Sequence, residues 1–319
     1  MLTFNTWLLE FANIKLADHV VERRDLIADE IEKSGADVIN LIEVRQLKNA
    51  SYLIEKLKKT YPYCSFNPDK IRPGSFYSNG LLVLSKWPLK NSGFRYKEGC
   101  IRPLQELVYA ETTRFDERLV SKGAIHNVLI HPDLGAIDLF SSHLGALSFA
   151  EKSNDYPEDQ KQKVFQQSAG LSSFIKQYSE TPSQILMIDT NRHFRKWNAF
   201  IGESHELDPT YSLFLESGFD DSFMTANHLN PRFTDNVYTF DQKRNPNAGD
   251  GHFSASPSEF IDYIFVRSKL LKAEVSSMLF TQAKKSSAGT DVFLSDHFAV
   301  TTTFSINRDA VILPLALRP

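Results

Sequence analysis

The pattern of apolar and polar positions along the chain predicts many strands and a few long helices. Residues 2–7 alternate as a strand does, and an amphipathic helix is expected over residues 19–34, with Gly35 as its carboxyl-terminal cap. The continuous apolar run ADVINLIEV, residues 36–44, ends in a carboxylate and predicts a buried strand. Helical spacing returns over residues 50–60.

The rest of the chain continues this mixture of elements. The apolar run at 79–85 predicts another buried strand, and a long helix is expected between residues 157 and 178. Further strands are predicted at residues 104–110, 121–130, 136–143, 184–189, 261–267, 273–280 and 296–304. The polar stretch 241–259 predicts a long loop, and such loops are more often functional than not.

This order of elements favours one large domain over two. A length of 319 residues suggests about two domains, but no Pro-, Gly- or Ser-rich linker divides the chain into two blocks. We therefore expect an α/β fold with two packed mixed β-sheets flanked by helices, which is a four-layer α/β sandwich. The predicted domain covers residues 1–307, and residues 308–319 form an appended carboxyl-terminal tail.

Composition and charge restrict the partners of the protein. With 42% hydrophobic and 24% charged residues, the chain has the composition of an ordinary globular protein. A formal net charge of −3 and a pI near 6.3 give no support to a surface built for nucleic acid, so that partner is less favoured. The two cysteines, Cys64 and Cys100, are too few for a disulfide framework and lie in no CxxC pattern, so both are expected to be ordinary thiols.

No targeting or membrane segment is predicted. The first residues, LTFNTWLLEF after the initial methionine, have no basic leader, long apolar run or cleavage site of a signal peptide. No run reaches the roughly 18 consecutive apolar residues of a membrane span. The compartment and the oligomeric state stay open at this point.

Several short segments share one design, in which an apolar strand ends and presents an acid, an amide or an imidazole. Active sites are commonly built at strand ends, where a rigid scaffold holds converging side chains. The candidate residues, in chain order, are Asn5, Glu43, His143, Asp189, Asn191, Asp262, Asp296 and His297. Singly, each has an ordinary structural explanation, since exposed acids are common and Asp and Asn populate turns. The complete ordered series is not expected from independent turns and therefore indicates an active site.

This series resembles the endonuclease/exonuclease/phosphatase superfamily, and the resemblance covers residues 2–304. It implies a four-layer α/β sandwich that hydrolyses phosphoester bonds with a divalent metal, usually Mg²⁺, with Mn²⁺ as an alternative. By position, Glu43 matches the metal-binding glutamate of that family, with Asn5 beside it and Asp296 as a further metal-site residue. One departure is visible, because Ile188 stands where the family usually has a glycine. We expect a local backbone difference there and an intact site.

The resemblance also implies roles for the remaining candidates. His143 matches the histidine that donates to the scissile phosphate, and Asp189 and Asn191 match the acid and amide that align or activate water. Asp262 matches the acid that orients the final histidine, His297. Hydrolysis needs such a set, because an anionic phosphodiester repels nucleophiles and a hard cation held by oxygen ligands offsets the growing charge. Whether Asp189 or His297 is the general base stays open.

Within the superfamily, the order of secondary motifs is most similar to that of neutral sphingomyelinases. The motifs include NTW at 5–7, LIEV at 41–44, SKWPL at 85–89, Lys122 with Gly123, and SSHLGA at 141–146. This resemblance implies a phosphoric diester hydrolase that releases phosphocholine from a phospholipid at a membrane surface. The alternatives are a nuclease and another phosphoesterase such as a phosphoinositide phosphatase. A binding protein on a retired enzyme fold gets little support, because every candidate position keeps an acceptable residue.

A lipid enzyme usually needs exposed aromatic or basic residues near the mouth of its active site. Two segments are candidates for such a rim, RHFRKWNAF at 192–200 and the stretch 222–240. Most of the 24 phenylalanines are nevertheless expected in the core, because exposed apolar clusters are uncommon.

Overall fold

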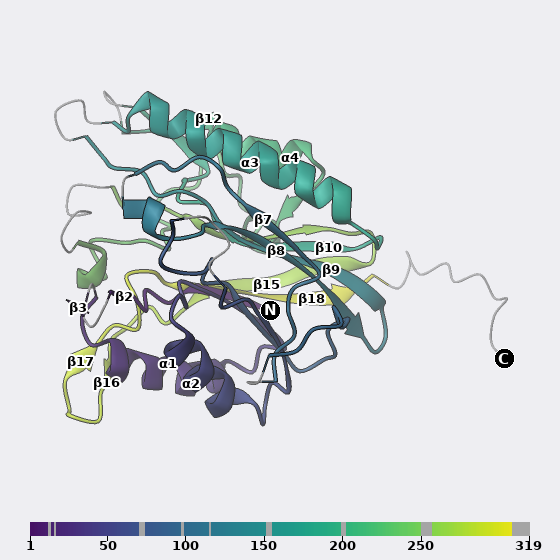
Figure 1. Cartoon of the computed structure of the whole chain (residues 1–319). Coiled ribbons are helices and arrows are strands. Elements are labelled where there is room, and N and C mark those ends of the chain that lie inside the picture. The colour runs from purple at the N-terminus through teal and green to yellow at the C-terminus, as the bar shows by residue number, and fades with distance from the viewer. Residues whose placement is uncertain are drawn as a thin grey trace, which may run out of the picture.

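The chain folds into four layers, which confirms the predicted fold class. Two six-stranded mixed sheets pack face to face, and helices cover the outer face of each sheet (Figure 1). The computed structural model describes residues 1–11, 14–15, 17–69, 74–96, 99–114, 116–150, 155–198, 202–249 and 257–307. The predicted tail at 308–319 and part of the predicted loop at 241–259 lie outside these residues.

The first sheet is built around two parallel strands, β1 and β4. Its strands, in spatial order, are β15 (Leu271–Leu279), β18 (Ala299–Ile306), β1 (Leu2–Asn5), β4 (Val38–Ile42), β6 (Leu82–Ser85) and β5 (Tyr63–Phe66). Helices α1 (Val20–Ser34) and α2 (Leu47–Leu57) lie on its outer face (Figure 1). Because β1 and β4 are parallel, their carboxyl ends reach the same edge of the sheet.

The second sheet has its own parallel pair, β9 and β10. Its strands, in spatial order, are β13 (Asp220–Asp221), β14 (Asp262–Arg267), β10 (Gln184–Asp189), β9 (Gly135–His143), β8 (Gly123–His131) and β7 (Gln105–Val108). Helices α3 (Glu158–Tyr178) and α4 (Pro209–Glu216) cover its outer face (Figure 1). Asp208 caps the amino end of helix α4, because its carboxylate accepts a hydrogen bond of 2.8 Å from the Thr210 amide.

Short elements connect these layers at the periphery. They are β2 (Glu10–Phe11), β3 (Ile14–Lys15), η1 (Asp116–Leu119), β11 (Arg195–Asn198), β12 (Gly202–Leu207), α5 (Ser222–Ala226), η2 (Pro246–Gly249), β16 (Lys284–Lys285) and β17 (Asp291–Val292). Among the described residues, no helix has both the length and the apolar character that crossing a bilayer requires.

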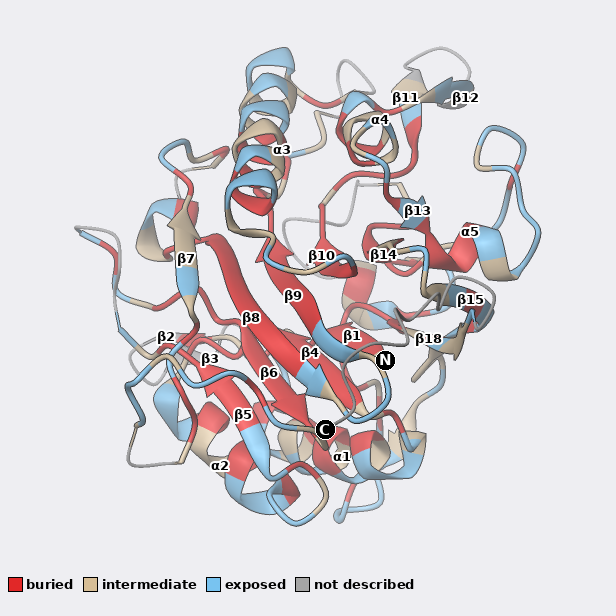
Figure 2. Ribbon diagram, turned by 90° about the vertical axis from the view of Figure 1, so that its right-hand side faces the viewer, coloured by how far each residue is buried: buried red, intermediate tan, exposed pale blue. Residues whose placement is uncertain are grey.

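The core explains why several strands read as continuous apolar runs. All five residues of β4 are buried, and Figure 2 shows β8, β9 and β10 buried over most of their length. Side chains of one sheet therefore pack against the other on one face and against helices on the opposite face. A polar contact also crosses the interface, because the Asn40 amide donates to the Met187 carbonyl at 3.3 Å.

Every predicted long helix and every predicted strand overlaps an element of the structure. The sequence did not indicate β5, α4 or the β11–β12 hairpin. β5 has four residues and α4 has eight, so neither is long enough to show a clear period. Ile188, at the position where a glycine was expected, continues β10 with its side chain fully buried.

The prediction that both cysteines are free thiols is wrong, because Cys64 and Cys100 form a disulfide. Cys64 lies in β5, and the segment that contains Cys100 runs beside this strand. The Ile101 amide donates to the Cys64 carbonyl at 2.9 Å, which brings the two Cα atoms to 4.7 Å. The two cysteines are 36 positions apart and belong to no recognisable cysteine pattern, so the sequence did not indicate that they are close in space.

We expect the disulfide to stabilise the fold by restricting the unfolded chain. Closing a loop with a sequence separation of 36 residues removes unfolded-state entropy worth about 2–4 kcal/mol. The variant Cys64→Ser/Cys100→Ser should therefore unfold at lower denaturant concentration than the oxidised parent, and reductant should lower only the parent's midpoint. Equal midpoints for parent and variant under oxidising conditions would contradict a stabilising bond.

Candidate active site

Three candidate residues meet because of strand register in the second sheet. In the pairing of β9 with β10, His143 lies opposite Asp189, and in the pairing of β10 with β14, Asp189 lies opposite Asp262. β9 and β10 end where the antiparallel β14 begins. The three side chains therefore share one edge of the sheet, and all three are buried.

The first sheet adds Asn5 and Glu43 at the same edge. The Asn5 amide donates to Asp189 Oδ2 at 2.9 Å, which links the end of β1 to the end of β10. Glu43 follows β4 directly, and its Oε1 lies 3.9 Å from His143 Nδ1. On its other side, His143 Nε2 lies 3.4 Å from Asp189 Oδ2. The imidazole of His143 thus lies between carboxylates from the two sheets.

A backbone turn and the side chain of Arg45 hold Glu43 in place. Its φ of 64° is left-handed, which turns the chain sharply at the end of β4. Arg45 Nη2 lies 3.3 Å from Glu43 Oε1 and 3.5 Å from His143 Nδ1. Arg45 reaches this position past Gly80, where an added Cβ would lie 2.8 Å from Arg45 Cγ. Arg45 was not among the predicted site residues, although it follows the Glu43 motif by two positions.

The last two candidates precede β18. His297 Nδ1 lies 2.8 Å from Asp262 Oδ2, and its Nε2 lies 3.9 Å from Asp296 Oδ1. The Ser295 hydroxyl lies within hydrogen-bonding distance of two oxygens, the Asn5 carbonyl at 2.7 Å and Asp296 Oδ1 at 3.0 Å. The structure therefore brings all eight candidate residues into one connected group at one end of the two sheets.

Asn191 takes part in this group differently from the other residues. Its backbone is left-handed, with φ 51°, and its amide N–H donates to Asp189 Oδ1 at 2.8 Å. Its side chain donates to the Leu144 carbonyl at 3.0 Å. In this conformation, Asn191 fixes Asp189 and the loop after His143.

The two histidines have opposite electrostatic environments. Burial lowers the pKa of His143 well below its ordinary value, and the positive charges of Lys122 and Arg45 lower this pKa further. Burial also acts to lower the pKa of His297, but the carboxylates of Asp262 and Asp296 outweigh it and raise that pKa well above its ordinary value. Without a bound cation, these surroundings therefore favour the neutral form of His143 and the protonated form of His297.

Two carboxylic acids of the group, Asp189 and Asp296, are destabilised as anions. Burial raises the pKa of Asp189, and the charge of Asp262 raises it further. Burial raises the pKa of Asp296 to about 6, with His297 opposing and Glu43 reinforcing the shift. One oxygen of Asp262, Oδ1, is buried without a hydrogen-bond partner among the described residues. Crowded carboxylates of this kind are stabilised when a cation joins them.

Two groupings of these residues contain atoms of the kind that bind a divalent metal ion. Glu43, Asn5 and Asp296 are the predicted metal residues, and they offer the hard oxygen donors that Mg²⁺ prefers. Asp189, Asp262 and His297 form a buried group whose potential ligand atoms lie within 4.8 Å of one another. In that second group, however, His297 is engaged with Asp262, and a protonated imidazole does not bind a metal.

Sequence reasoning missed part of the support around this group. Lys122 was considered only as part of a motif with Gly123, but its ammonium is buried and donates to the Leu144 carbonyl at 2.9 Å. It also forms an ion pair of 2.7 Å with buried Glu117. Gly123 is required next to it, since an added Cβ would lie 1.9 Å from the Leu107 carbonyl oxygen. Thr239 supports the site in turn, by accepting the Asp262 amide at 3.2 Å.

The proposed lipid-facing rims are supported only in part. The side chains of Arg192, His193, Phe194 and Arg195 are buried, so the first segment does not present them to a membrane. In the second segment, Phe233 is 66% exposed. Most phenylalanines in the described part of the chain are buried, as expected from the rarity of exposed apolar clusters.

Comparison with known proteins identifies the family. The model of the Endonuclease/Exonuclease/phosphatase family matches residues 2–297, and the chain belongs to this family. The protein is accordingly a hydrolytic phosphoesterase. No significant match was found among curated protein sequences.

Solved structures share the fold at low sequence identity. Sphingomyelinase C from Streptomyces griseocarneus aligns with a TM-score of 0.66 and 18% identity, over 94% of this chain and 96% of that one. A mutant of beta toxin from Staphylococcus aureus with bound magnesium ions aligns with a TM-score of 0.63 and 16% identity, over 94% and 97%. TDP2 from D. rerio, complexed with a single-strand DNA product, aligns with a TM-score of 0.60 and 15% identity, over 95% and 97%.

The position of Lys122 predicts a measurable effect on His143. Replacing this cation in Lys122→Met should raise the pKa of His143, because a neighbouring positive charge is removed, while burial still keeps it below the ordinary value. Glu117 would lose its buried partner, so we also expect a stability loss of about 3 kcal/mol. An NMR titration of the histidine resonances in the metal-free protein measures the first effect.

A matched control is Lys163→Met, which removes an exposed lysine of α3. It should leave the pKa of His143 unchanged. A His143 pKa that is the same in Lys122→Met and in the parent would show that Lys122 does not act on this imidazole.

Proposed function

We propose that the protein is a metal-dependent phosphodiesterase that hydrolyses a phospholipid head group and releases phosphocholine. The observation that carries this proposal is the convergence of Glu43, Asp189 and the Asp262–His297 pair at one edge of the two sheets. Such a set offers a cation site, an acid and an oriented imidazole, which are the groups that hydrolysis of a phosphate ester needs.

Glu43 is the principal proposed metal ligand, with Asn5 and Asp296 completing the site. When bound, Mg²⁺ or Mn²⁺ would withdraw charge from the phosphoryl oxygens. Burial is the main cause of the raised pKa of Asp296, and the negative charge of Glu43 raises this pKa further. A cation held near these carboxylates would stabilise both as anions, which supports the assignment. The side-chain amide nitrogen of Asn5 donates to Asp189, so the atom of Asn5 that could bind the metal is its side-chain oxygen. This oxygen also accepts a hydrogen bond of 3.1 Å from the Trp7 amide.

The remaining residues act on the phosphate and on water. Neutral His143 holds a proton on one ring nitrogen and donates it as a hydrogen bond to a phosphoryl oxygen. Asp262 fixes the orientation of His297 through Nδ1, which leaves Nε2 directed away from this bond. His297 accepts a proton from water once it is itself deprotonated, and Asp189, held by Asn5 and the Asn191 amide, is the alternative base.

The order of motifs and the structural neighbours favour a choline lipid as the substrate. One of the similar folds is named sphingomyelinase C, and the acidic chain offers little attraction to a polyanionic backbone. A nuclease is the second candidate. It is favoured by the similar fold of TDP2, which was solved with a single-strand DNA product.

A substrate panel tests this proposal directly. With Mg²⁺ present, we expect phosphocholine release from sphingomyelin, slower release from lysophosphatidylcholine, and little turnover of phosphatidylinositol phosphates, abasic DNA or RNA. A chelator should abolish the activity, and added Mg²⁺ or Mn²⁺ should restore it, because the cation offsets the phosphate charge.

Glu43→Gln is the informative variant in this panel, with Glu55→Gln on the exposed face of α2 as its matched control. The first should lose activity and the second should keep it. Efficient cleavage of DNA with choline lipids untouched would replace the lipid proposal by the nuclease. Full activity of Glu43→Gln in metal-free buffer would remove the metal assignment.

The Asp262–His297 pair predicts how kcat depends on pH and in which direction this dependence shifts when Asp262 is replaced. Because the pKa of His297 is raised, kcat should increase with pH as the imidazole loses its proton above neutrality. Asp262→Asn removes the carboxylate that raises this pKa, so the rising limb should move to lower pH while kcat falls. Loss of a general base typically lowers the rate by about 10²–10⁴-fold.

The kinetics of a double variant test whether Asp262 and His297 act together. Asp262→Asn/His297→Ala should be little worse than His297→Ala, because the two residues act as a unit. An unshifted pH profile in Asp262→Asn, or additive losses in the double variant, would show that the imidazole does not depend on Asp262 and would favour Asp189 as the base.

A further inference from the structure

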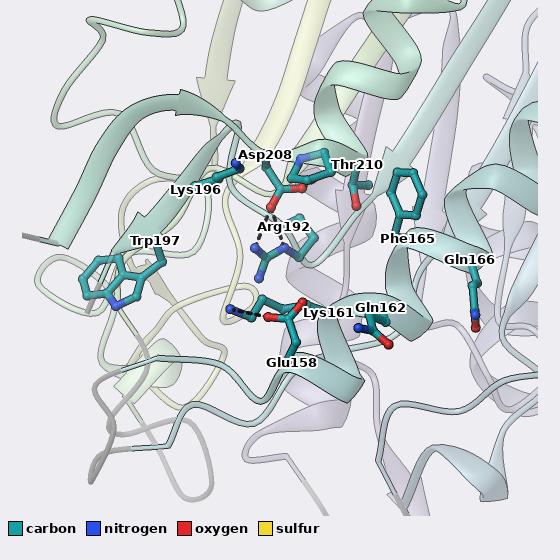
Figure 3. Close-up of a pocket in the computed structure, with 11 residues that line it drawn as sticks. Glu158, Lys161, Gln162, Phe165, Gln166, Arg192, Lys196, Trp197, Asp208 and Thr210 are labelled. Atoms are coloured by element: carbon teal, nitrogen blue, oxygen red, sulfur yellow. Dashed lines mark hydrogen bonds and ion pairs between the residues drawn. The ribbon is translucent and has the colours of Figure 1, made fainter. Parts of the chain in front are cut away.

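A separate pocket of about 620 Å³ lies on the outer side of the second sheet, and none of the eight predicted site residues lines it. It is enclosed by the first turns of α3, by β11 and by the beginning of α4 (Figure 3). Arg192 forms part of its lining. This arginine directly follows Asn191, so one turn of chain connects the candidate active site with the pocket.

Arg192 is an unusual residue for a pocket wall. Its side chain is only 6% exposed, and it forms an ion pair with Asp208 through Nε at 3.0 Å and Nη2 at 2.5 Å. Its guanidinium lies over the ring of Tyr156, 5.3 Å from the centroid. The third nitrogen, Nη1, is buried and has no hydrogen-bond partner among the described residues. Figure 3 shows this nitrogen directed away from Asp208, into the space between α3 and β11.

An unpartnered guanidinium nitrogen in a buried position is costly. Leaving a buried donor unsatisfied costs about 1–3 kcal/mol, and more for a charged group. An oxyanion would supply the missing acceptor, because Arg binds carboxylate and phosphate through charge-assisted hydrogen bonds. Among the neighbouring acids, Glu158 is already paired with Lys161 at 3.2 Å. Buried Glu259, whose charge also acts on Arg192, accepts a hydrogen bond of 2.8 Å from the Tyr156 hydroxyl.

The walls of the pocket are partly apolar. Phe165 lines it from α3 and is 41% exposed, and Trp197 lines it from β11. Large apolar side chains left open to a concave surface are typical of small-molecule sites that combine apolar contact with a few polar groups. The two glutamines Gln162 and Gln166 complete the α3 side and are exposed.

We infer that this pocket binds a small soluble molecule that carries a phosphate or carboxylate group on an apolar body. The anionic group accepts from Arg192 Nη1, and the apolar body lies against Phe165 and Trp197. This binding does not depend on the proposed hydrolysis, so it can be tested whatever the substrate of the enzyme is.

The test uses the full chain with Mg²⁺ present and observes the tryptophan indole N–H resonances by NMR. The chain has three tryptophans, of which only Trp197 lines the pocket, while Trp87 packs against His131. The probes are phenylphosphonate, benzoate and inorganic phosphate, and Trp197→Phe assigns the resonance. We expect phenylphosphonate or benzoate to shift the Trp197 signal saturably with the Trp87 signal unmoved, and inorganic phosphate to bind more weakly because it lacks the apolar body.

Variants locate the binding site. Arg192→Lys keeps a positive charge opposite Asp208 but removes Nη1, and should weaken binding by about tenfold or more. Gln162→Glu/Gln166→Glu adds negative charge to the pocket wall and should weaken binding by about fivefold. The control Gln177→Glu makes the same change at an exposed α3 position outside the pocket and should bind as the parent does.

Two results would overturn the inference. One is a Trp197 resonance that does not move with either organic anion up to about 10 mM, which corresponds to negligible affinity. The other is unchanged affinity in the Gln162→Glu/Gln166→Glu variant. The latter does not touch the buried ion pair, so it stays informative even if Arg192→Lys fails to fold.

Discussion

The hydrogen bond from Asn5 to Asp189 is the contact on which the candidate site depends most. It joins the end of β1 in one sheet to the end of β10 in the other, in a place where both side chains are buried. Without this donor, Asp189 would keep the Asn191 amide as a donor but would face the charge of Asp262 with less compensation. The bond therefore joins the two sheets at the edge where Glu43 Oε1 from one sheet lies 3.9 Å from His143 Nδ1 of the other.

The charges around the two histidines favour different protonation states. Lys122 and Arg45 lie near His143 and favour its neutral form, while carboxylates surround His297 and favour its protonated form. Both effects come from residues on different strands and loops, so the protonation states are set by the fold and not by local sequence. A cation bound near Glu43 and Asp296 would reduce the negative potential around His297 and make its deprotonation easier. Metal binding would therefore be coupled to the protonation of His297.

Much of this arrangement could be predicted from the sequence. Most of the strands that carry the site are buried and appear in the sequence as apolar runs. A polar site residue lies at or beside one end of each strand, as in LIEV and LMID. The ordered series of polar strand ends is informative because strand register, once formed, places such ends side by side. The fold class followed from the mixture of these strands with three amphipathic helices.

Other features depended on tertiary contacts that leave no periodic signal. The disulfide forms because the segment around Ile101 pairs beside β5, a strand of only four residues. Arg192 lies in a polar segment that resembled a surface rim, but pairing with Asp208 makes its burial possible. Arg45 and Lys122 were also unremarkable in sequence, since a charged residue near a turn is usually solvated.

The central claim is that the shared edge of the two sheets binds a divalent cation through Glu43. Anomalous diffraction from crystals grown with Mn²⁺ tests this claim most directly, because it locates the ion without reference to any substrate. We expect one strong anomalous peak within bonding distance of the Glu43 carboxylate, and its loss in Glu43→Gln. A peak bonded only to Asp189, Asp262 or His297, or a peak that persists unchanged in Glu43→Gln, would contradict it.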